Sequence, residues 1–195
     1  MKQMDINKRF ELLGQLIGNP LNGWKTIGKQ KFSVKQFRNE FMFPAIGVFV
    51  LAEMIGMLID AESQFGPNWF IIVYSIVIGF GLYFSYYLSL FLMRFLLKSF
   101  EYKGNTDFLY WMLGIPLIIG YVPVEIMALF QSMSFLILLS IYAFVVFWFG
   151  IQKLVGLDKE KKQVFGILSI VFSITAHVFV FFLIFAIRRP IIELF

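Results

Sequence analysis

Five apolar stretches, each long enough to cross a lipid bilayer as a helix, constrain this chain more than any other feature of its sequence. They cover residues 41–60, 69–97, 108–131, 133–157 and 164–187. A helix rises about 1.5 Å per residue, so about 20 apolar residues span the hydrocarbon core. A mean hydropathy of +0.80 with only 15% charged residues excludes an ordinary soluble domain. The sequence therefore predicts an all-α, polytopic membrane protein whose transmembrane domain of five helices covers residues 41–187.

The first forty residues form a basic segment before the first apolar stretch. Ile6, Phe10, Leu13 and Ile17 recur at helical spacing and predict an amphipathic helix at the membrane interface, ended by Gly18-Asn19-Pro20. A second short helix is expected to begin at Ser33, with Gln36 three residues on. Residues expected to meet the membrane surface or a partner are Lys8, Arg9, Trp24, Lys25, Lys29, Lys31, Lys35 and Arg38. An electrostatic anchor to anionic lipid and a face that binds a protein partner are both open.

The distribution of basic residues predicts the orientation. All Lys and Arg except Arg188 and Arg189 precede the first stretch, stand near the end of the second or fourth stretch, or fall in the loop that follows it. The positive-inside rule places that side, with the amino terminus, in the cytoplasm. Arg188 and Arg189 begin a short tail, 188–195, on the opposite side if the last helix crosses fully; an incomplete last helix is the alternative. Trp69 and Trp111, near the ends of stretches, are expected to be interfacial anchors.

Two prolines interrupt the third stretch. Pro116 and Pro123 lie seven residues apart, and Gly120 and Tyr121 stand between them. Proline removes a helical hydrogen bond, so we expect this helix to kink or break and to free backbone carbonyl groups. Such breaks line cavities in membrane proteins. The alternative is an ordinary transmembrane helix whose neighbours compensate for its prolines.

Ionisable residues inside the apolar stretches form the candidate site. Glu53 and Glu125 each stand about two thirds of the way along a helix that runs in the same direction, so similar depths are expected for them. Asp60 follows Glu53 by seven residues on the same helix face, and His177 lies near the middle of the fifth stretch. Charged groups at such depths are costly and mark functional sites. Together these four residues could line a polar cavity that relays protons or binds a cation, and simple packing roles are the alternative.

The sequence offers little for catalysis. There is no Cys and a single His, which excludes thiol chemistry and leaves no ligand set for a metal. Ser173 stands four residues before His177, without a Gly-x-Ser-x-Gly context. No phosphate-binding loop or dinucleotide fingerprint occurs. We therefore expect no enzyme activity, no catalytic residue, no metal, no cofactor and no nucleic acid partner.

Several short motifs in their order resemble the Yip-one domain family of membrane proteins, which interact with Ypt/Rab GTPases in eukaryotes and also occur in bacteria. The motifs are Asn19-Pro20 with Trp24 and Ile27, Pro44, Gly104, Gly120-Tyr121 with Pro123, and residues 142–150 with Leu154 before a lysine-rich loop. The likeness covers residues 19–187. The Asp-Leu-Tyr-Gly-Pro element of eukaryotic members is absent, so the resemblance does not imply Rab binding by this chain. The resemblance is to the bacterial branch, which implies a place in the cytoplasmic membrane.

This resemblance implies five membrane spans, a cytosolic amino terminus and a role in organising partners rather than catalysis. Two functions follow from the sequence as a whole. One is a membrane scaffold that binds lipids or a cytoplasmic or membrane protein through its basic segment. The other is a transporter of a small solute or ion that uses Glu53 and Glu125, and its transport could be coupled to protons. A homo-oligomer is a further possibility, with Gly47, Gly79 and Gly81 as candidate close-packing points.

Overall fold

The computed structural model describes residues 5–30, 33–59 and 68–193, and every regular element in these ranges is a helix. The helices are α1 (Ile6–Gly18), α2 (Pro20–Gln30), α3 (Val34–Phe37), a π-helical turn η1 (Arg38–Met42), α4 (Phe43–Ile59), α5 (Asn68–Ser99), α6 (Phe108–Leu129), a 3-10 helix η2 (Gln131–Leu136), α7 (Ile137–Ser140), α8 (Tyr142–Leu154) and α9 (Lys159–Glu193). The all-α prediction is confirmed.

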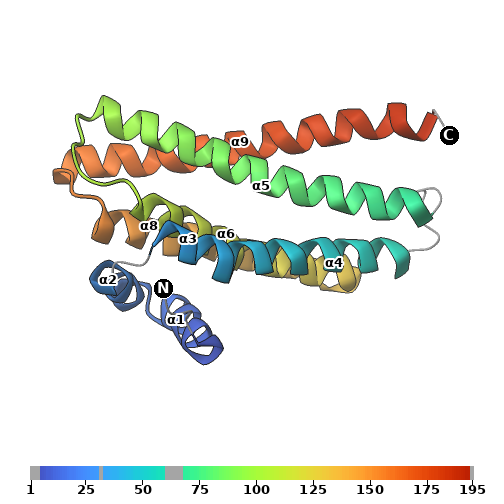
Figure 1. Ribbon diagram of the computed structural model, residues 1–195, viewed down its shortest axis with the longest axis horizontal. Coiled ribbons are helices and arrows are strands. Elements are labelled where there is room, and N and C mark those ends of the chain that lie inside the picture. Colours follow the sequence, from blue (N-terminus) through green and yellow to red (C-terminus); the bar gives the residue numbers. More distant parts are fainter. Residues whose placement is uncertain (1–4, 31–32, 60–67, 194–195) are drawn as a thin grey trace.

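Five crossings are long and apolar enough to span a membrane, as predicted. They are Val34–Ile59, Trp69–Ser99, Phe108–Leu129, Ser132–Leu154 and Lys159–Ala186. The protein is therefore a multi-pass membrane protein. Successive crossings run in opposite directions along one bundle axis (Figure 1). We call the end where α3 begins and α5 ends the basic end, and the end where α4 ends the far end.

The bundle has two layers. The long helices α5 and α9 lie side by side, and α4, α6 and α8 pack together as the other layer (Figure 1). Helix α6 is the centre of the packing, because every residue from 111 to 116 is buried. Trp111 is only 1% exposed and its ring lies 5.0 Å from that of Phe37, centroid to centroid. The prediction that Trp111 is an interfacial anchor is therefore wrong, whereas Trp69 is 44% exposed at the far end.

The amino-terminal segment folds as two helices outside the bundle at the basic end (Figure 1). Helix α1 matches the predicted amphipathic helix, and its face bearing Ile6, Phe10 and Ile17 is exposed. The sequence prediction missed α2, which begins at Pro20 and packs along α8. Ser33 caps the next helix as expected, since its hydroxyl accepts a hydrogen bond from the backbone N–H of Gln36 at 3.1 Å.

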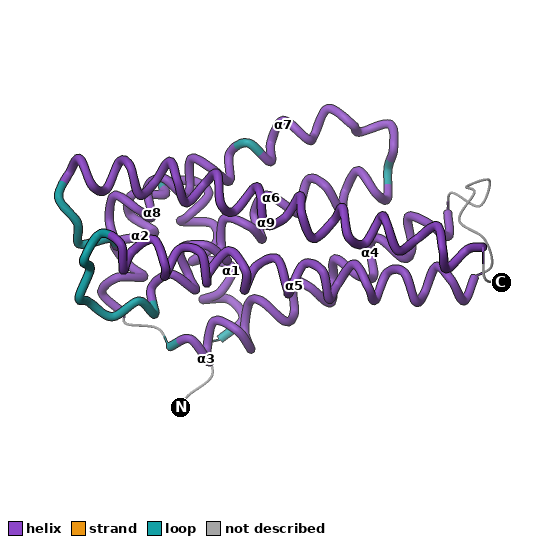
Figure 2. Tube along the Cα trace, turned by 90° about the horizontal axis from the view of Figure 1, so that it is seen from above, coloured by secondary structure: helices purple, strands orange, loops and turns teal. Residues whose placement is uncertain are grey.

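The interruption expected in the third crossing lies in the fourth instead. Helix α6 continues through Pro116 and Pro123, so the predicted break there is wrong. After α6, η2 contains a non-helical Met133, and α7 and α8 are separate short helices. The stretch from η2 to α7 arches away from the rest of the bundle (Figure 2). The neighbouring helices bury residues 111–116 and Pro123, and this packing favours a continuous helix over a break.

The last crossing is a single helix. The backbone of α9 continues to Glu193, beyond the predicted end at residue 187, so residues 188–193 extend the helix rather than form a separate tail. Arg188 and Arg189 therefore lie near the far end, at the opposite end of the bundle from the amino-terminal helices (Figure 1).

Two of the three predicted close-packing glycines serve contacts within the chain. A Cβ added to Gly79 would meet Val50 on α4, and one added to Gly81 would meet Ile184 on α9. These glycines let the neighbouring helices approach α5. A Cβ added to Gly47 would meet nothing within 4 Å, so only this position remains open for a contact with a second copy.

Candidate functional site

Three of the ionisable residues predicted to form a site stand at similar positions along their crossings, counted from the first residue of each. Glu53, Glu125 and His177 belong to crossings that all run from the basic end to the far end (Figure 1). Each follows the first residue of its crossing by 17 to 19 positions; those first residues are Val34, Phe108 and Lys159. A helix rises by a constant amount per residue, so equal counts give similar depths where the crossings begin at one level. The counts agree with the similar depth predicted for Glu53 and Glu125, which stays a prediction.

Helices α4 and α6 bring the two carboxylates together. Glu53 and Glu125 lie close enough to interact electrostatically. One helical turn further along, Gly56 packs so closely on α6 that an added Cβ would collide with the backbone oxygen of Ala128. The missing side chain at Gly56 therefore permits a close contact between α4 and α6, and both carboxylates stand three residues before that contact.

Glu125 is the more enclosed of the two. Its residue is 7% exposed, and its Oε2 is buried without a hydrogen-bond partner among the described residues. A buried, charged carboxylate oxygen without a hydrogen-bond donor lowers the stability of the folded protein by several kcal/mol. A proton or a cation between Glu53 and Glu125 would supply the missing partner and remove the repulsion between two charged carboxylates.

Tyr121 connects this pair to His177. Its side chain interacts with Glu125, one turn away on α6, and its ring centroid lies 6.1 Å from that of His177 and 5.7 Å from that of Phe49. The sequence prediction included Tyr121 only as part of a helix break. Tyr121 lies between the carboxylates and the imidazole because of the rotation of α6 about its axis. The sequence does not predict this rotation.

His177 has one satisfied and one unsatisfied ring nitrogen. Its Nδ1 lies 2.7 Å from the backbone oxygen of Ser173, and its Nε2 is buried without a partner among the described residues. The ring therefore bonds the main chain of Ser173 rather than its hydroxyl. That arrangement gives no activated serine, and the described residues contain no group of three His, Cys, Asp or Glu side chains that could hold a metal.

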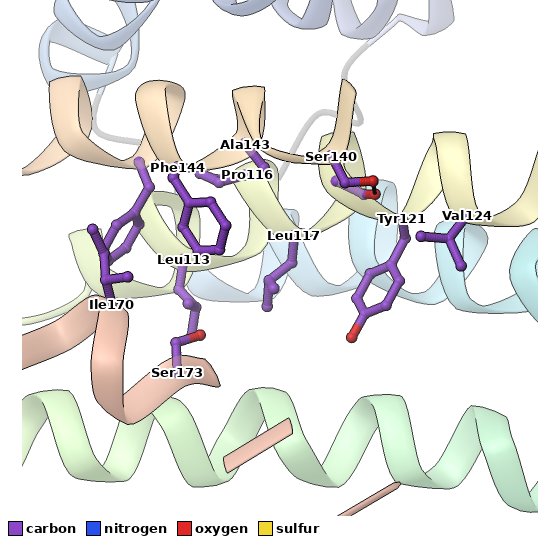
Figure 3. A pocket seen from close by; sticks show the side chains of 12 residues that line it. Leu113, Pro116, Leu117, Tyr121, Val124, Ser140, Ala143, Phe144, Ile170 and Ser173 are labelled. Carbon is purple, nitrogen blue, oxygen red and sulfur yellow. Dashed lines mark hydrogen bonds between the residues drawn. The ribbon is translucent and has the colours of Figure 1, made fainter. Parts of the chain in front are cut away.

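A largely apolar cavity of about 220 Å³ lies beside the polar residues, between α6, α8 and α9. Tyr121 and Ser173 lie on its wall, together with Leu113, Leu117 and Phe144 (Figure 3). Ser140 closes one side, where its hydroxyl donates a hydrogen bond of 2.7 Å to the backbone oxygen of Gly120 (Figure 3). Of the four residues predicted to mark a helix break, Pro116, Gly120 and Tyr121 line this cavity, whereas Pro123 is buried beside it.

Comparison with known proteins found no matching family model, no similar curated protein and no similar solved structure. The function is therefore argued from the geometry of the chain itself.

The predicted surface of basic residues is present in part. Lys8, Lys25, Lys29 and Lys35 are exposed. Trp24 does not belong to this surface, because it is fully buried and its indole N–H donates a hydrogen bond of 2.7 Å to the backbone oxygen of Val146. Trp24 instead fixes α2 against α8. Asp60 and Lys31, which were also predicted as site residues, lie outside the described residues.

Arg9 and Glu40 form an ion pair that the sequence prediction missed. The Arg9 Nε atom lies 3.7 Å from Glu40 Oε2, and its Nη1 donates to the backbone oxygen of Glu40 at 3.2 Å. Gln36 also donates to Glu40 Oε2, at 3.3 Å. Glu40 is buried in the π-helical turn η1, so this pair ties α1 to the beginning of the first crossing. The only sequence signal was an acidic residue directly before an apolar stretch.

Proposed function

We propose that this protein is a transporter of a small solute in the cytoplasmic membrane, coupled to a proton or a monovalent cation bound between Glu53 and Glu125. The observation that carries the proposal is a buried oxygen of Glu125 that has no donor among the described residues, beside the close contact of α4 and α6 at Gly56 that brings Glu53 within electrostatic range. An intramembrane carboxylate pair of this kind suits a site that gains and loses a cation.

The surroundings of the pair support coupling. Tyr121 interacts with Glu125 and also lies on the wall of the apolar cavity. When one carboxyl group is protonated, it can donate a hydrogen bond to the other, and when the proton leaves, Glu125 needs a new partner. Tyr121 is the side chain placed to respond. A change at the carboxylates can therefore alter the shape of the cavity, which is what coupled transport requires.

The orientation follows from charge. Lysine and arginine residues are concentrated in the amino-terminal helices and in the helix ends and the loop at the basic end. The positive-inside rule assigns this end to the cytoplasm. The carboxylate pair then lies in the half of the membrane nearer the outside.

The proposal is tested by following protonation directly. Infrared spectroscopy of the purified protein over a pH series resolves the C=O stretching band of a protonated carboxyl group. We expect a titrating band that disappears in Glu53→Gln and Glu125→Gln variants. Glu101→Gln, at an exposed loop position, is the matched control and is expected to keep the band. A band unchanged in both site variants would remove the proposed cation site.

Flux is tested separately in proteoliposomes. With a potassium gradient, valinomycin, an internal pH dye and a panel of small solutes added in turn, the wild type is expected to change the pH of the lumen only with the solute that it carries, and each Gln variant is expected to abolish this change. The double variant is expected to be no worse than either single variant, because both residues serve one site. Wild-type flux in both single variants would contradict a transport role for the pair.

A scaffold function is the second candidate, and the amino-terminal helices favour it. Helices α1 and α2 are held against the bundle by Trp24, and their outer surface carries exposed lysines. The resemblance to the Yip-one domain family agrees with such a role. A photo-cross-linker at Lys25 or Lys29 distinguishes the candidates, because a scaffold is expected to capture a protein partner. Recovery of phospholipid alone would count against it.

A further inference from the structure

Two arginines near the basic end have no carboxylate partner among the described residues. Arg38 lies in the π-helical turn η1 at the start of the first crossing, and its Nε contacts only the side-chain oxygen of Asn39, at 3.4 Å. Arg94 is exposed near the end of α5. Glu40, the acidic residue of the same turn, pairs with Arg9 instead. Two guanidinium groups therefore stand at the edge of the membrane without a neutralising acid in the described part of the chain.

A continuous row of aromatic rings joins these arginines. The guanidinium carbon of Arg38 lies 5.8 Å from the centroid of the Phe43 ring, and that of Arg94 lies 4.9 Å from the Tyr110 ring. Between them, ring centroids follow at 5.9, 4.6 and 6.3 Å for the pairs Phe43–Tyr83, Tyr83–Tyr87 and Tyr87–Tyr110. Cation–π contacts hold the guanidinium groups in place and leave their N–H donors to other acceptors.

An apolar groove begins at the same rings. It lies between α4 and α5, has a volume of about 380 Å³ and shares Phe43 and Tyr83 with the aromatic row. Ile76 and Phe80 on its α5 side are exposed, and Gly79 leaves room for Val50 at its floor. The groove runs along the membrane-crossing part of both helices. A ligand that fits both features has an anionic head and an apolar tail.

We propose that this surface binds an anionic glycerophospholipid from the leaflet at the basic end. Arg38 and Arg94 donate hydrogen bonds to the phosphate and to the neighbouring oxygens of the head group, the tyrosine hydroxyl groups add hydrogen bonds, and one acyl chain fills the groove between α4 and α5. Charge complementarity selects an anionic lipid, because a zwitterionic head group would bring its own cation beside two arginines. This site is separate from the carboxylate pair and does not depend on the transport proposal.

Native mass spectrometry of the full-length protein in detergent tests the head-group contact. The probes are palmitoyl-oleoyl phosphatidylglycerol and palmitoyl-oleoyl phosphatidylcholine, added at equal concentrations. The wild type is expected to retain one phosphatidylglycerol in preference to phosphatidylcholine. The double variant Arg38→Gln with Arg94→Gln is expected to lose this preference by about tenfold, since each arginine contributes a charge-assisted hydrogen bond. The double variant Lys35→Gln with Lys98→Gln removes the same charge from exposed positions and is expected to keep it.

A second variant tests the groove without changing charge. Ile76→Trp places a larger side chain on the groove wall and is expected to reduce retention of phosphatidylglycerol while the unfolding temperature stays at the wild-type value. If the arginine and lysine double variants lost the preference for phosphatidylglycerol equally, the lipid would be attracted by net charge alone, and the proposed site would be overturned. Equal retention of both lipids by the wild type, or unaltered retention by Ile76→Trp, would equally overturn the proposal.

Discussion

Replacement of Trp24 tests how the amino-terminal helices are attached. Trp24 is fully buried between α2 and α8, and its indole N–H donates to the backbone oxygen of Val146 at 2.7 Å. Its ring also packs on Gly150, where an added Cβ would lie 3.0 Å from Cε2. These two contacts join α2 directly to α8. Trp24→Ala is therefore expected to release α2 from α8 before the transmembrane helices unfold.

The magnitude follows from the contacts that are lost. Truncation of a fully buried tryptophan to alanine costs about 3–5 kcal/mol. Trp24→Phe removes the hydrogen bond, worth about 0.5–1.5 kcal/mol, and the volume of one ring. The oxygen of Val146 keeps its helical partner within α8, so no carbonyl group is left without a donor. We expect a smaller effect for phenylalanine than for alanine, with the order wild type, Trp24→Phe, Trp24→Ala.

Hydrogen–deuterium exchange of the detergent-solubilised protein measures the release of α2 from α8. A loss of 3 kcal/mol corresponds to a more than about hundredfold faster exchange in residues 20–30, if these amides exchange through local opening. Lys25→Ala, on the exposed side of the same helix, is the control and is expected to leave exchange unchanged. Unaltered protection of residues 20–30 in Trp24→Ala, or an equal loss throughout α9, would refute the proposed attachment.

Two further substitutions test contacts of α6. Gly56→Leu forces a side chain against the backbone of Ala128 and is expected to destabilise the protein by about 1–3 kcal/mol and to weaken the titrating infrared band, whereas Gly47→Leu, with open space around its Cβ, is expected to leave both unchanged. A Gly56→Leu variant with wild-type unfolding temperature would contradict the close contact. Ser140→Ala removes the hydrogen bond to Gly120 and is expected to cost about 0.5–1.5 kcal/mol in thermal unfolding, and an unchanged midpoint would show that this bond does not hold α7 against α6.

The sequence predicts the transmembrane helices well because their signal is composition over about 20 residues. Helix α2 was missed although its signals are present: Pro20 stands at the first helical position, and Leu21, Trp24 and Ile27 repeat at a spacing of three. Lysines and glycines surround these residues, and this composition predicts an exposed segment. Its partner, α8, is more than a hundred residues away in the chain, so only the tertiary structure reveals which side of α2 is buried.

The interrupted crossing shows a limit of local rules. Pro116 and Pro123 are the strongest helix breakers in the transmembrane region, yet α6 continues through them. The fourth crossing is interrupted at the non-helical Met133 and at Ile141, between α7 and α8. A proline removes one hydrogen bond from a helix; the burial of residues 111–116 and of Pro123 holds α6 in place, whereas most of η2 and α7 is exposed. The extent of burial decides between the two positions, and burial is not a local property.

The carboxylate pair illustrates what depth counting achieves. Equal counts along parallel helices predict that Glu53 and Glu125 lie at one level, but they do not predict which way each side chain points. Gly56 supplies the missing information, because a residue without a side chain at helical spacing from Glu53 marks the face on which another helix approaches closely. A glycine three residues from an intramembrane carboxylate is therefore a sequence signal for contact. Applied to α4, it points Glu53 at α6, where Glu125 stands three residues before Ala128.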